Sequence, residues 1–175
     1  MLIAMAGLPA SGKSAVARPL AAALPALLLD KDAVRARLFG PHVDYRRAQN
    51  DLVVDITYQV GAYVLGRDPT AAVLLDGRTY SRRYQLDALA AAAREAASPL
   101  RLIECVCSPE SALERLERDA ARPGAHPAAD RDAALYRASR AAAEPIERSR
   151  LVLDTDALTP TESVRVALEW LRYER

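Results

Sequence analysis

The segment at residues 5–18, "MAGLPASGKSAVAR", constrains the fold more than any other part of the sequence. The residues that match the pattern G-x-x-x-x-G-K-[ST] are Gly7, Gly12, Lys13 and Ser14. An apolar run precedes the pattern, and a helical pattern follows it. In that setting consecutive backbone N–H groups and the N-terminus of a helix surround one anion. The segment therefore predicts a strand, a phosphate-binding loop and a helix, in that order.

The length and the composition of the chain indicate a single domain over residues 1–175. A chain of 175 residues with 51% apolar content can bury one core and is short for two. The 24 basic and 23 acidic residues give a net charge of +1, so no overall field attracts the protein to long nucleic acids or anionic membranes. Any basic binding site must therefore be local.

Short apolar runs alternate with helical patterns along the chain. The apolar runs, each predicted to be a strand, cover residues 2–6, 26–29, 71–75, 100–107 and 150–154. The helical patterns cover residues 13–23, 32–38, 45–65, 81–96, 109–119, 131–143 and 160–173. This alternation predicts a three-layer α/β domain with a five-stranded, mostly parallel sheet and helices on both faces.

Two helices carry residues that bear on their shape. Pro19 lies midway along the first helix, where it removes a backbone hydrogen bond and is expected to kink the helix. The helix over residues 45–65 is predicted to stop at Gly66. Its apolar residues at helical spacing are Leu52, Ile56, Val60 and Tyr63.

The residue types of the glycine loop indicate a nucleotide with a magnesium ion. The lysine supplies a mobile positive charge for the outer phosphates, and the serine hydroxyl is a ligand for Mg²⁺. We therefore expect ATP and Mg²⁺ as cofactors. The residues expected to hold the nucleotide are Gly7, Ala10, Ser11, Gly12, Lys13, Ser14 and Ala15. The alternative is a turn that matches the pattern without a ligand, and the position between the first strand and the first helix favours the nucleotide.

Acidic and basic residues follow the second apolar run, in "LLLDKDAVRARL". In open α/β sheets ligands bind beyond the carboxyl ends of the strands, so Asp30, Asp32 and Arg35 are candidates for contact with a phosphoryl acceptor. Asp32 and Arg35 are three residues apart and share one face of the next helix. Either aspartate is a candidate base for the acceptor hydroxyl, and either is equally suited to cap the helix.

The third apolar run ends in "VLLDGRTYSRR" and offers further candidates. Asp76 is expected to hold Mg²⁺, directly or through water. Arg78 and Arg82 are candidates for orienting the acceptor. The alternative is that two of the three arginines Arg78, Arg82 and Arg83 are solvated residues in the first turn of the next helix.

A predicted lid follows the fourth strand. Two prolines and a glycine interrupt the helical patterns in "ARPGAHPAAD", so we expect a mobile lid over about residues 118–131. Arg115, Arg118 and Arg122 lie on one helical side beside it. Arginines that arrive with a closing lid neutralise the transferring phosphoryl group, and Arg118 is also expected to contact the nucleotide. The alternative is a charged surface helix paired with acidic neighbours.

The sequence also predicts a cytoplasmic protein with no membrane partner. Residues 1–10 have no basic leader and too short an apolar stretch for a signal peptide. No run approaches the roughly 20 apolar residues of a membrane span. Cys105 and Cys107 share one apolar run, where a bridge between them is unfavourable, and this suits a reducing compartment.

With these segments assembled, the chain resembles a group of P-loop kinases. The group includes polynucleotide 5'-hydroxyl kinase, zeta toxins, gluconate kinase, chloramphenicol phosphotransferase and many bacterial predicted kinases. "GLPASGKS" is similar to the opening loop of the group, "DAVR" at 32–35 to its D-x-x-R acceptor motif, and "RDAAR" at 118–122 to its R-x-x-x-R lid motif. The resemblance implies the P-loop NTPase fold, and it implies that Asp32 rather than Asp30 is the general base.

The expected function is transfer of the γ-phosphoryl group of ATP·Mg²⁺ to a hydroxyl of a small molecule, such as a nucleoside, a sugar or an antibiotic-like compound. Lys13, Asp32, Arg118 and Arg122 are the expected catalytic residues. One alternative is a polynucleotide 5'-hydroxyl kinase, which the near-zero net charge disfavours. The other is a non-catalytic ATP-binding regulatory module in which Asp32 only caps a helix.

Overall fold

A parallel sheet of five strands forms the centre of the molecule. The structure is a computed structural model, and it describes residues 1–121 and 132–173. The strands are β1 (Leu2–Ala6), β2 (Leu27–Asp30), β3 (Val73–Asp76), β4 (Leu100–Val106) and β5 (Leu151–Asp154). They lie in the order β2-β3-β1-β4-β5, and every neighbouring pair is parallel. The α/β fold with five strands is therefore confirmed, and the described sheet is entirely parallel.

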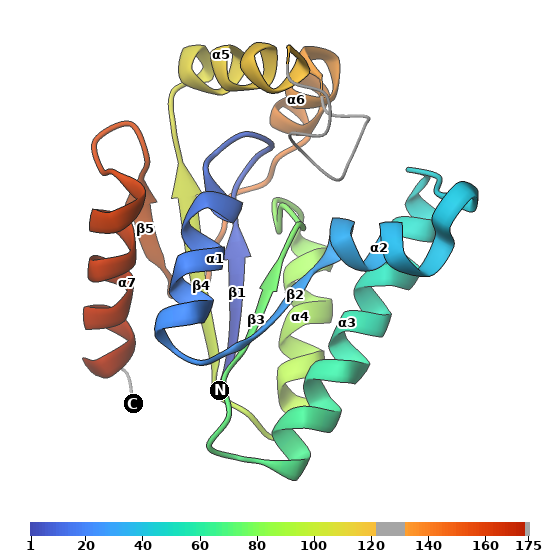
Figure 1. Cartoon of the computed structure of the whole chain (residues 1–175), viewed down its shortest axis with the longest axis vertical. Helices are drawn as coiled ribbons and strands as arrows, with labels where there is room; N and C mark the ends of the chain where they lie inside the picture. Colours follow the sequence, from blue (N-terminus) through green and yellow to red (C-terminus); the bar gives the residue numbers. More distant parts are fainter. Residues whose placement is uncertain (122–131, 174–175) are drawn as a thin grey trace.

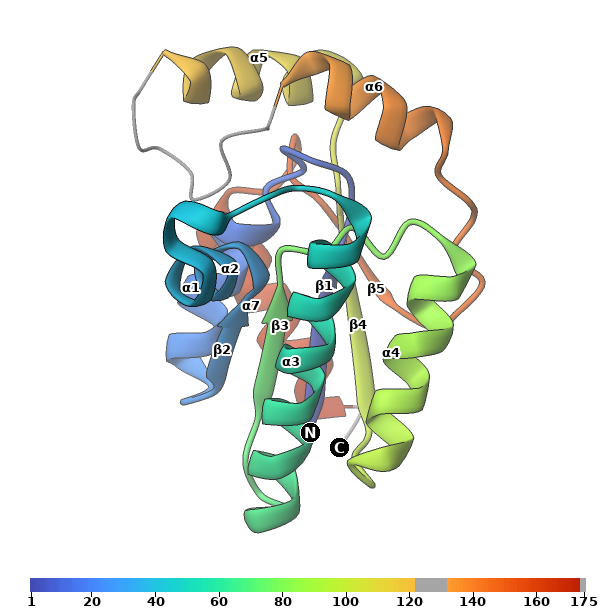
Figure 2. The same ribbon diagram turned by 90° about the vertical axis from the view of Figure 1, so that its right-hand side faces the viewer.

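Helices cover both faces of the sheet (Figures 1 and 2). The helices are α1 (Lys13–Ala23), α2 (Lys31–Phe39), α3 (Arg47–Arg67), α4 (Arg83–Glu95), α5 (Pro109–Ala120), α6 (Ala133–Ala141) and α7 (Pro160–Tyr173), with a short 3₁₀ turn η1 (Gly40–His42). Alternate residues of β1 point to opposite faces. Ile3 and Met5 pack with α1 and α7, whereas Leu2 and Ala4 pack with α3 and α4. The three-layer arrangement is confirmed. None of the helices in the described residues combines the length and the apolarity needed to cross a membrane.

Helices α5 and α6 lie together beyond the carboxyl edge of the sheet (Figure 1). Ala112 and Leu116 of α5 pack with Tyr136 of α6 and with Ala10 of the glycine loop in a small apolar cluster. The predicted lid falls mainly between these helices, and its residues 122–131, Arg122 included, lie outside the described residues.

The structure adds detail to the predicted helices. α1 spans Lys13–Ala23 with Pro19 inside it, and Val16, Ala17 and Leu20 are buried against the sheet and α7. α3 passes Gly66 and ends at Arg67. The helix over residues 45–65 is confirmed, but the apolar set at helical spacing is not its buried face, because Leu52, Val60 and Tyr63 are exposed. The buried residues of α3 are Gln49, Val53, Val54, Thr57, Gly61 and Leu65.

Candidate active site

The glycine loop connects β1 to α1 in a conformation that requires its glycines. Gly7 has φ +131°, and a Cβ atom there would lie 2.2 Å from the carbonyl oxygen of Cys105. Gly12 has φ +85° and occupies the N-cap position of α1. Side chains are disfavoured at both positions, so glycine at each of them permits the tight turn of the loop into the N-terminus of α1.

Lys13 lies over this loop. Its ammonium group donates hydrogen bonds to the carbonyl oxygens of Gly7, at 2.7 Å, and Leu8, at 2.8 Å. Charged acceptors such as phosphate oxygens bind an ammonium group more strongly than neutral carbonyls do. The lysine is therefore positioned to turn toward a phosphate bound by the loop.

Arg115 of α5 and the loop after β5 form hydrogen bonds to the glycine loop. Arg115 of α5 donates to the carbonyl oxygen of Ala10 at 3.3 Å and to Thr155 Oγ1 at 2.9 Å. Its other terminal nitrogen donates to Thr155 O at 2.9 Å and to Asp156 Oδ1 at 3.1 Å. Thr155 Oγ1 also lies 3.1 Å from the carbonyl oxygen of Ser11. Arg115, expected beside the lid, is thus bonded to the loop itself.

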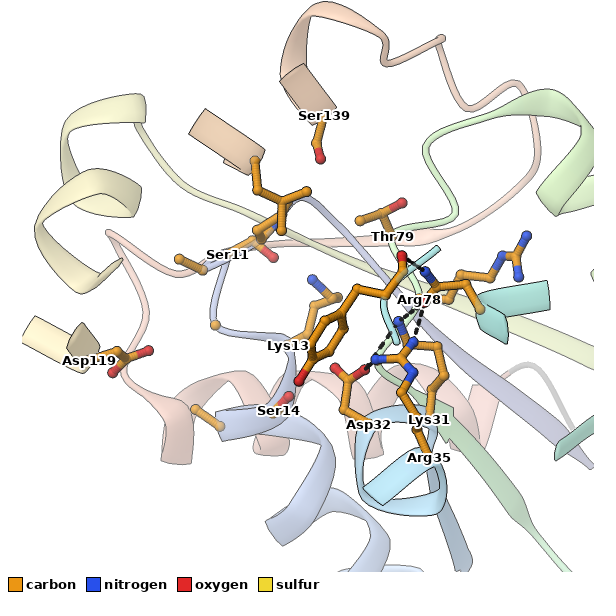
Figure 3. A pocket seen from close by; sticks show the side chains of 18 of the residues that line it. Ser11, Lys13, Ser14, Lys31, Asp32, Arg35, Arg78, Thr79, Asp119 and Ser139 are labelled. Carbon is orange, nitrogen blue, oxygen red and sulfur yellow. Dashed lines mark hydrogen bonds and ion pairs between the residues drawn. The ribbon is translucent and has the colours of Figure 1, made fainter. Parts of the chain in front are cut away.

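One pocket of about 740 Å³ joins the glycine loop to the start of α2. Its walls come from the glycine loop, the first turns of α1, α2, α3 and α4, the loop after β3, and α5 and α6. Figure 3 shows Lys13 and Ser14 on one side of this space and Asp32, Arg35 and Arg78 on the other. The sequence candidates from three separate segments are therefore brought to one pocket.

The two aspartates at the start of α2 have different positions. Asp30 is the N-cap of the helix, because its carboxylate accepts hydrogen bonds from the backbone N–H groups of Asp32, at 2.9 Å, and Ala33, at 3.3 Å. Asp32 lines the pocket. Its Oδ1 atom lies 2.8 Å from Arg35 Nη1 and 3.2 Å from Lys31 Nζ.

Arg35 is held rigidly beside Asp32. It is 1% exposed, its other terminal nitrogen donates to Asn50 Oδ1, and its guanidinium lies 5.1 Å from the centre of the Tyr45 ring. Asn50 in turn accepts from Lys31 Nζ at 3.1 Å and donates to the carbonyl oxygen of Tyr45 at 2.7 Å. Burial lowers the pKa of Lys31, Asp32 opposes this effect, and Arg35 adds to it.

Asp76, at the end of β3, is the second residue expected to hold a metal, and it is not among the residues that line the pocket. The carboxylate is buried, and within the described residues neither of its oxygens has a hydrogen-bond partner. A buried carboxylate without partners is costly, and a cation or its bound water would relieve that cost. The described residues contain no cluster of three or more histidine, cysteine, aspartate or glutamate side chains that could hold a metal. A magnesium ion here would therefore need phosphate oxygens and water besides Ser14 and Asp76.

The two candidate arginines after β3, Arg78 and Arg82, lie in different places. Arg78 lines the pocket and donates to Asp51 Oδ1 at 2.9 Å. The structure does not bring Arg82 there, because its guanidinium donates to the carbonyl oxygen of Ala142 and lies 3.8 Å from Glu144. These partners come from the segment after α6, which is distant in sequence and holds Arg82 away from the acceptor side. Arg118 of α5 lines the pocket.

Sequence reasoning missed several residues of this pocket. Arg47, Asn50 and Asp51 come from the first turn and a half of α3, and Tyr84 comes from α4. No local motif marks the polar residues at the start of α3, or Lys31 between its two aspartates, as part of a site.

The parallel sheet and the glycine loop between β1 and α1 together define the P-loop NTPase fold, which P-loop kinases share. The sequence matches the family described as an AAA domain over residues 2–146, which is most of its length. The chain therefore belongs to this AAA domain family, and the predicted relation to the P-loop kinase group is confirmed. None of the curated proteins matches the sequence.

Several solved structures share the fold. A provisionally assigned kinase from Chloroflexus aurantiacus is 23% identical, with a TM-score of 0.79, over 98% of this chain and 96% of its own. The APS kinase of Mycobacterium tuberculosis, in complex with AMPPNP and APS, is 17% identical, with a TM-score of 0.70, over 98% of this chain and 96% of its own. A gluconokinase from Sinorhizobium meliloti is 18% identical, with a TM-score of 0.65, over 98% and 91%.

Proposed function

We propose that the protein is an ATP-dependent phosphotransferase that moves the γ-phosphoryl group of ATP to a hydroxyl of a small polar molecule. Nucleosides, sugars and antibiotic-like compounds are the acceptor classes that we favour. The observation that carries the proposal is the position of Asp32, which lines the same pocket as Lys13 and Ser14. Nucleotide binding alone requires no carboxylate at that place, whereas transfer requires a group that positions and deprotonates the acceptor.

In the transfer step, the acceptor oxygen forms a bond to the γ-phosphorus. The bond from that phosphorus to the β,γ-bridging oxygen breaks, and ADP leaves. Asp32 takes the proton of the acceptor hydroxyl, while Arg35 and Arg78 orient the acceptor. Lys13 and the loop residues from Ala10 to Ala15 hold the phosphates of the nucleotide.

Ser14 and Asp76 would hold the magnesium ion, Asp76 directly or through water. When bound, the ion would neutralise charge on the β- and γ-phosphates. Asp76 is otherwise buried without a partner in the described part of the chain, which supports this role. Arg118 would close over the transferring group, and we expect the same of Arg122.

Two further observations support a small acceptor. The net charge of +1 gives the protein no general attraction to nucleic acid, so a polynucleotide acceptor is the less favoured alternative. The APS kinase that shares this fold was solved in complex with AMPPNP and APS. We place the activity in the cytoplasm, and the free thiols of Cys105 and Cys107 support a reducing compartment.

An acceptor screen tests the proposal. Purified protein is incubated with ATP and Mg²⁺, and ADP release is measured against separate pools of nucleosides, sugars, aminoglycosides and 5'-hydroxyl oligonucleotides. We expect one small-molecule pool to raise ADP release well above the rate with no acceptor. A protein that binds ATP and releases no ADP with any pool would be a regulatory module instead.

A further inference from the structure

Charged residues are concentrated on the acceptor side of the pocket. We call six of them the charged cluster: Lys31, Asp32, Arg35, Arg47, Asp51 and Arg78, all of which line the pocket. Four are basic and two are acidic, so the cluster carries a net charge of +2 at neutral pH. The whole chain has a net charge of only +1. The positive charge is therefore local, as a binding site for an anion requires.

Within the charged cluster, Arg47 and Arg78 share one carboxylate and one aromatic ring. Asp51 lies between them, with Oδ2 3.3 Å from Arg47 Nε and Oδ1 2.9 Å from Arg78 Nη2. The two guanidinium groups lie 4.8 and 5.8 Å from the centre of the Tyr84 ring. A single carboxylate leaves one positive charge of this pair unbalanced. Ring and carboxylate together hold both guanidinium planes in place against the pocket.

The remaining cations of the charged cluster are also only partly compensated. Lys31 and Arg35 both lie within hydrogen-bond or ion-pair distance of Asp32, so one carboxylate faces two cations. Within the described residues, the Nε atoms of Arg35 and Arg78 are buried and have no hydrogen-bond partner. Buried donors without acceptors are costly, and an anion bound at the guanidinium edges would reduce that cost. Burial is the main cause of the lowered pKa of Lys31; Asp32 opposes the shift, and Arg35 and Arg78 add to it.

We propose that the acceptor carries an anionic group, a phosphate or a carboxylate, in addition to the hydroxyl that receives the phosphoryl group, and that Arg47, Arg78 and Lys31 bind this anion. The inference rests on the proposed function, since it names the class of acceptor for the same site. Asp32 remains next to the hydroxyl, and the anionic group lies toward α3 and the loop after β3. A neutral acceptor of the same size would leave the positive surplus without a partner.

Direct binding tests the anion site independently of turnover. The protein is first saturated with AMPPNP and Mg²⁺, so that the glycine loop is occupied, and is then titrated calorimetrically with inorganic phosphate. We expect saturable binding with a Kd of about 1 mM or lower, and we expect Arg47→Gln and Arg78→Gln each to weaken it by about tenfold or more. Absence of saturable binding by the loaded protein would overturn the inference.

Arg46→Gln is the matched control. Arg46 stands next to Arg47 in sequence, and its side chain is 85% exposed, against 76% for Arg47. It pairs with Asp44 at 2.7 Å and does not line the pocket. Phosphate binding should be unchanged in this variant. A loss equal to that of Arg47→Gln would mean that phosphate responds to net charge alone, which would contradict a specific site.

Paired acceptors then separate the inference from the proposed function. Each neutral hydroxyl compound is compared with an anionic relative: glycerol with glycerate and with glycerol 3-phosphate, ribose with ribose 5-phosphate, and adenosine with adenosine 3'-monophosphate. We expect kcat/KM for phosphoryl transfer to be at least about tenfold higher for an anionic member, and Arg47→Gln to remove most of that preference. Equal rates for neutral and anionic members would leave the kinase proposal standing and overturn the inference.

Two other outcomes are also decisive. Phosphate binding that depends on Arg47 and Arg78, without transfer to any acceptor, would support the anion site and contradict the proposed kinase function. Transfer to a 5'-hydroxyl oligonucleotide and to none of the small compounds would overturn the inference of a small anionic acceptor.

Discussion

The Asp30 carboxylate accepts a hydrogen bond from the backbone N–H of Asp32 at 2.9 Å. This bond caps α2 and turns the following residues into the helix, so that Asp32 reaches the pocket while Asp30 stays at the helix end. Two carboxylates that the sequence left equivalent as base or cap are therefore distinguishable by substitution. The same change at the two positions should have different consequences.

Asp32→Asn should lower the rate of phosphoryl transfer about 100-fold or more, because an amide cannot take the proton of the acceptor hydroxyl. ATP affinity should be nearly unchanged, since Asp32 acts on the acceptor. Rates are compared at a temperature where circular dichroism shows the variant to be folded, because Arg35 loses a charged partner.

Asp30→Asn is the matched control for this prediction. Asparagine caps helices about as well as aspartate, so this variant should keep its stability and most of its activity. A wild-type transfer rate in folded Asp32→Asn protein would remove the general base from the mechanism.

Arg115→Ala should weaken ATP binding by about tenfold, because Arg115 holds the glycine loop through Ala10 and holds Thr155, which reaches Ser11. Titration with ATP measures the effect. Arg165→Ala removes an exposed ion pair with Glu169 on α7 and serves as a control that should leave ATP affinity unchanged. Equal ATP affinity in the Arg115 variant and the wild type would show that ATP binding does not need the contacts of Arg115 with the glycine loop.

Arg118→Ala should lower kcat by up to about 1,000-fold while changing ATP affinity much less, because its contact with the phosphoryl group is expected to strengthen in the transition state. Steady-state kinetics with varied ATP separate the two effects. If Arg118 is only a surface residue, kcat will be that of the wild type, and stability will change by less than about 1 kcal/mol.

Alkaline conditions should destabilise the fold. Burial raises the pKa of the Cys105 thiol to about 12, and it raises the pKa of Tyr80 well above its ordinary value. The unfolded thiol ionises near pH 8.5, so above that pH the unfolded chain loses a proton that the folded chain keeps. The free energy of unfolding must then fall as the pH rises, by up to about 1.4 kcal/mol per pH unit for each such group.

Urea unfolding at pH 7.5 and pH 10 measures this effect. Between the two values, Cys105→Ala should lose about 2 kcal/mol less stability than the wild type, because the titrating thiol is gone. Cys107→Ala is the comparison: burial also raises the pKa of this partly buried thiol, so this variant should show a smaller change of the same sign. An identical pH dependence in the wild type and the Cys105 variant would contradict the raised pKa.

The sequence predicted the parts of this molecule that depend on neighbours along the chain. The loop with Gly7 and Gly12, between an apolar strand and a helix, needs only local spacing to be recognised. Arg115 and Thr155 are 40 residues apart, and no pattern in either segment predicts their contact. Arg82 was misplaced for the same reason, because its partners lie about 60 residues away. Which arginines of a basic segment face a pocket is decided by such distant partners.

Surface exposure was the other property that local patterns did not reveal. Leu52, Val60 and Tyr63 recur at helical spacing and are exposed, while Val53 and Val54 are buried. The buried face of α3 also includes Gln49, Thr57 and Gly61, so it does not form a continuous apolar pattern in the sequence.

The central claim is tested most directly by following a label in the γ-phosphate of ATP. Wild-type protein, Lys13→Ala and Asp32→Asn are each incubated with labelled ATP, Mg²⁺ and the acceptor pools, and the products are separated. The account predicts that the wild type moves the label into a phosphate ester of a small hydroxyl compound. Lys13→Ala should keep its circular dichroism spectrum, because the ammonium group of Lys13 donates hydrogen bonds to the loop carbonyl oxygens of Gly7 and Leu8 and is not part of the apolar core. It should transfer no label, because the proposed role of Lys13 is to bind the phosphates. The contradicting result is a wild-type protein that binds ATP but forms no labelled ester with any pool. In that case the label would stay in ATP or appear only as inorganic phosphate.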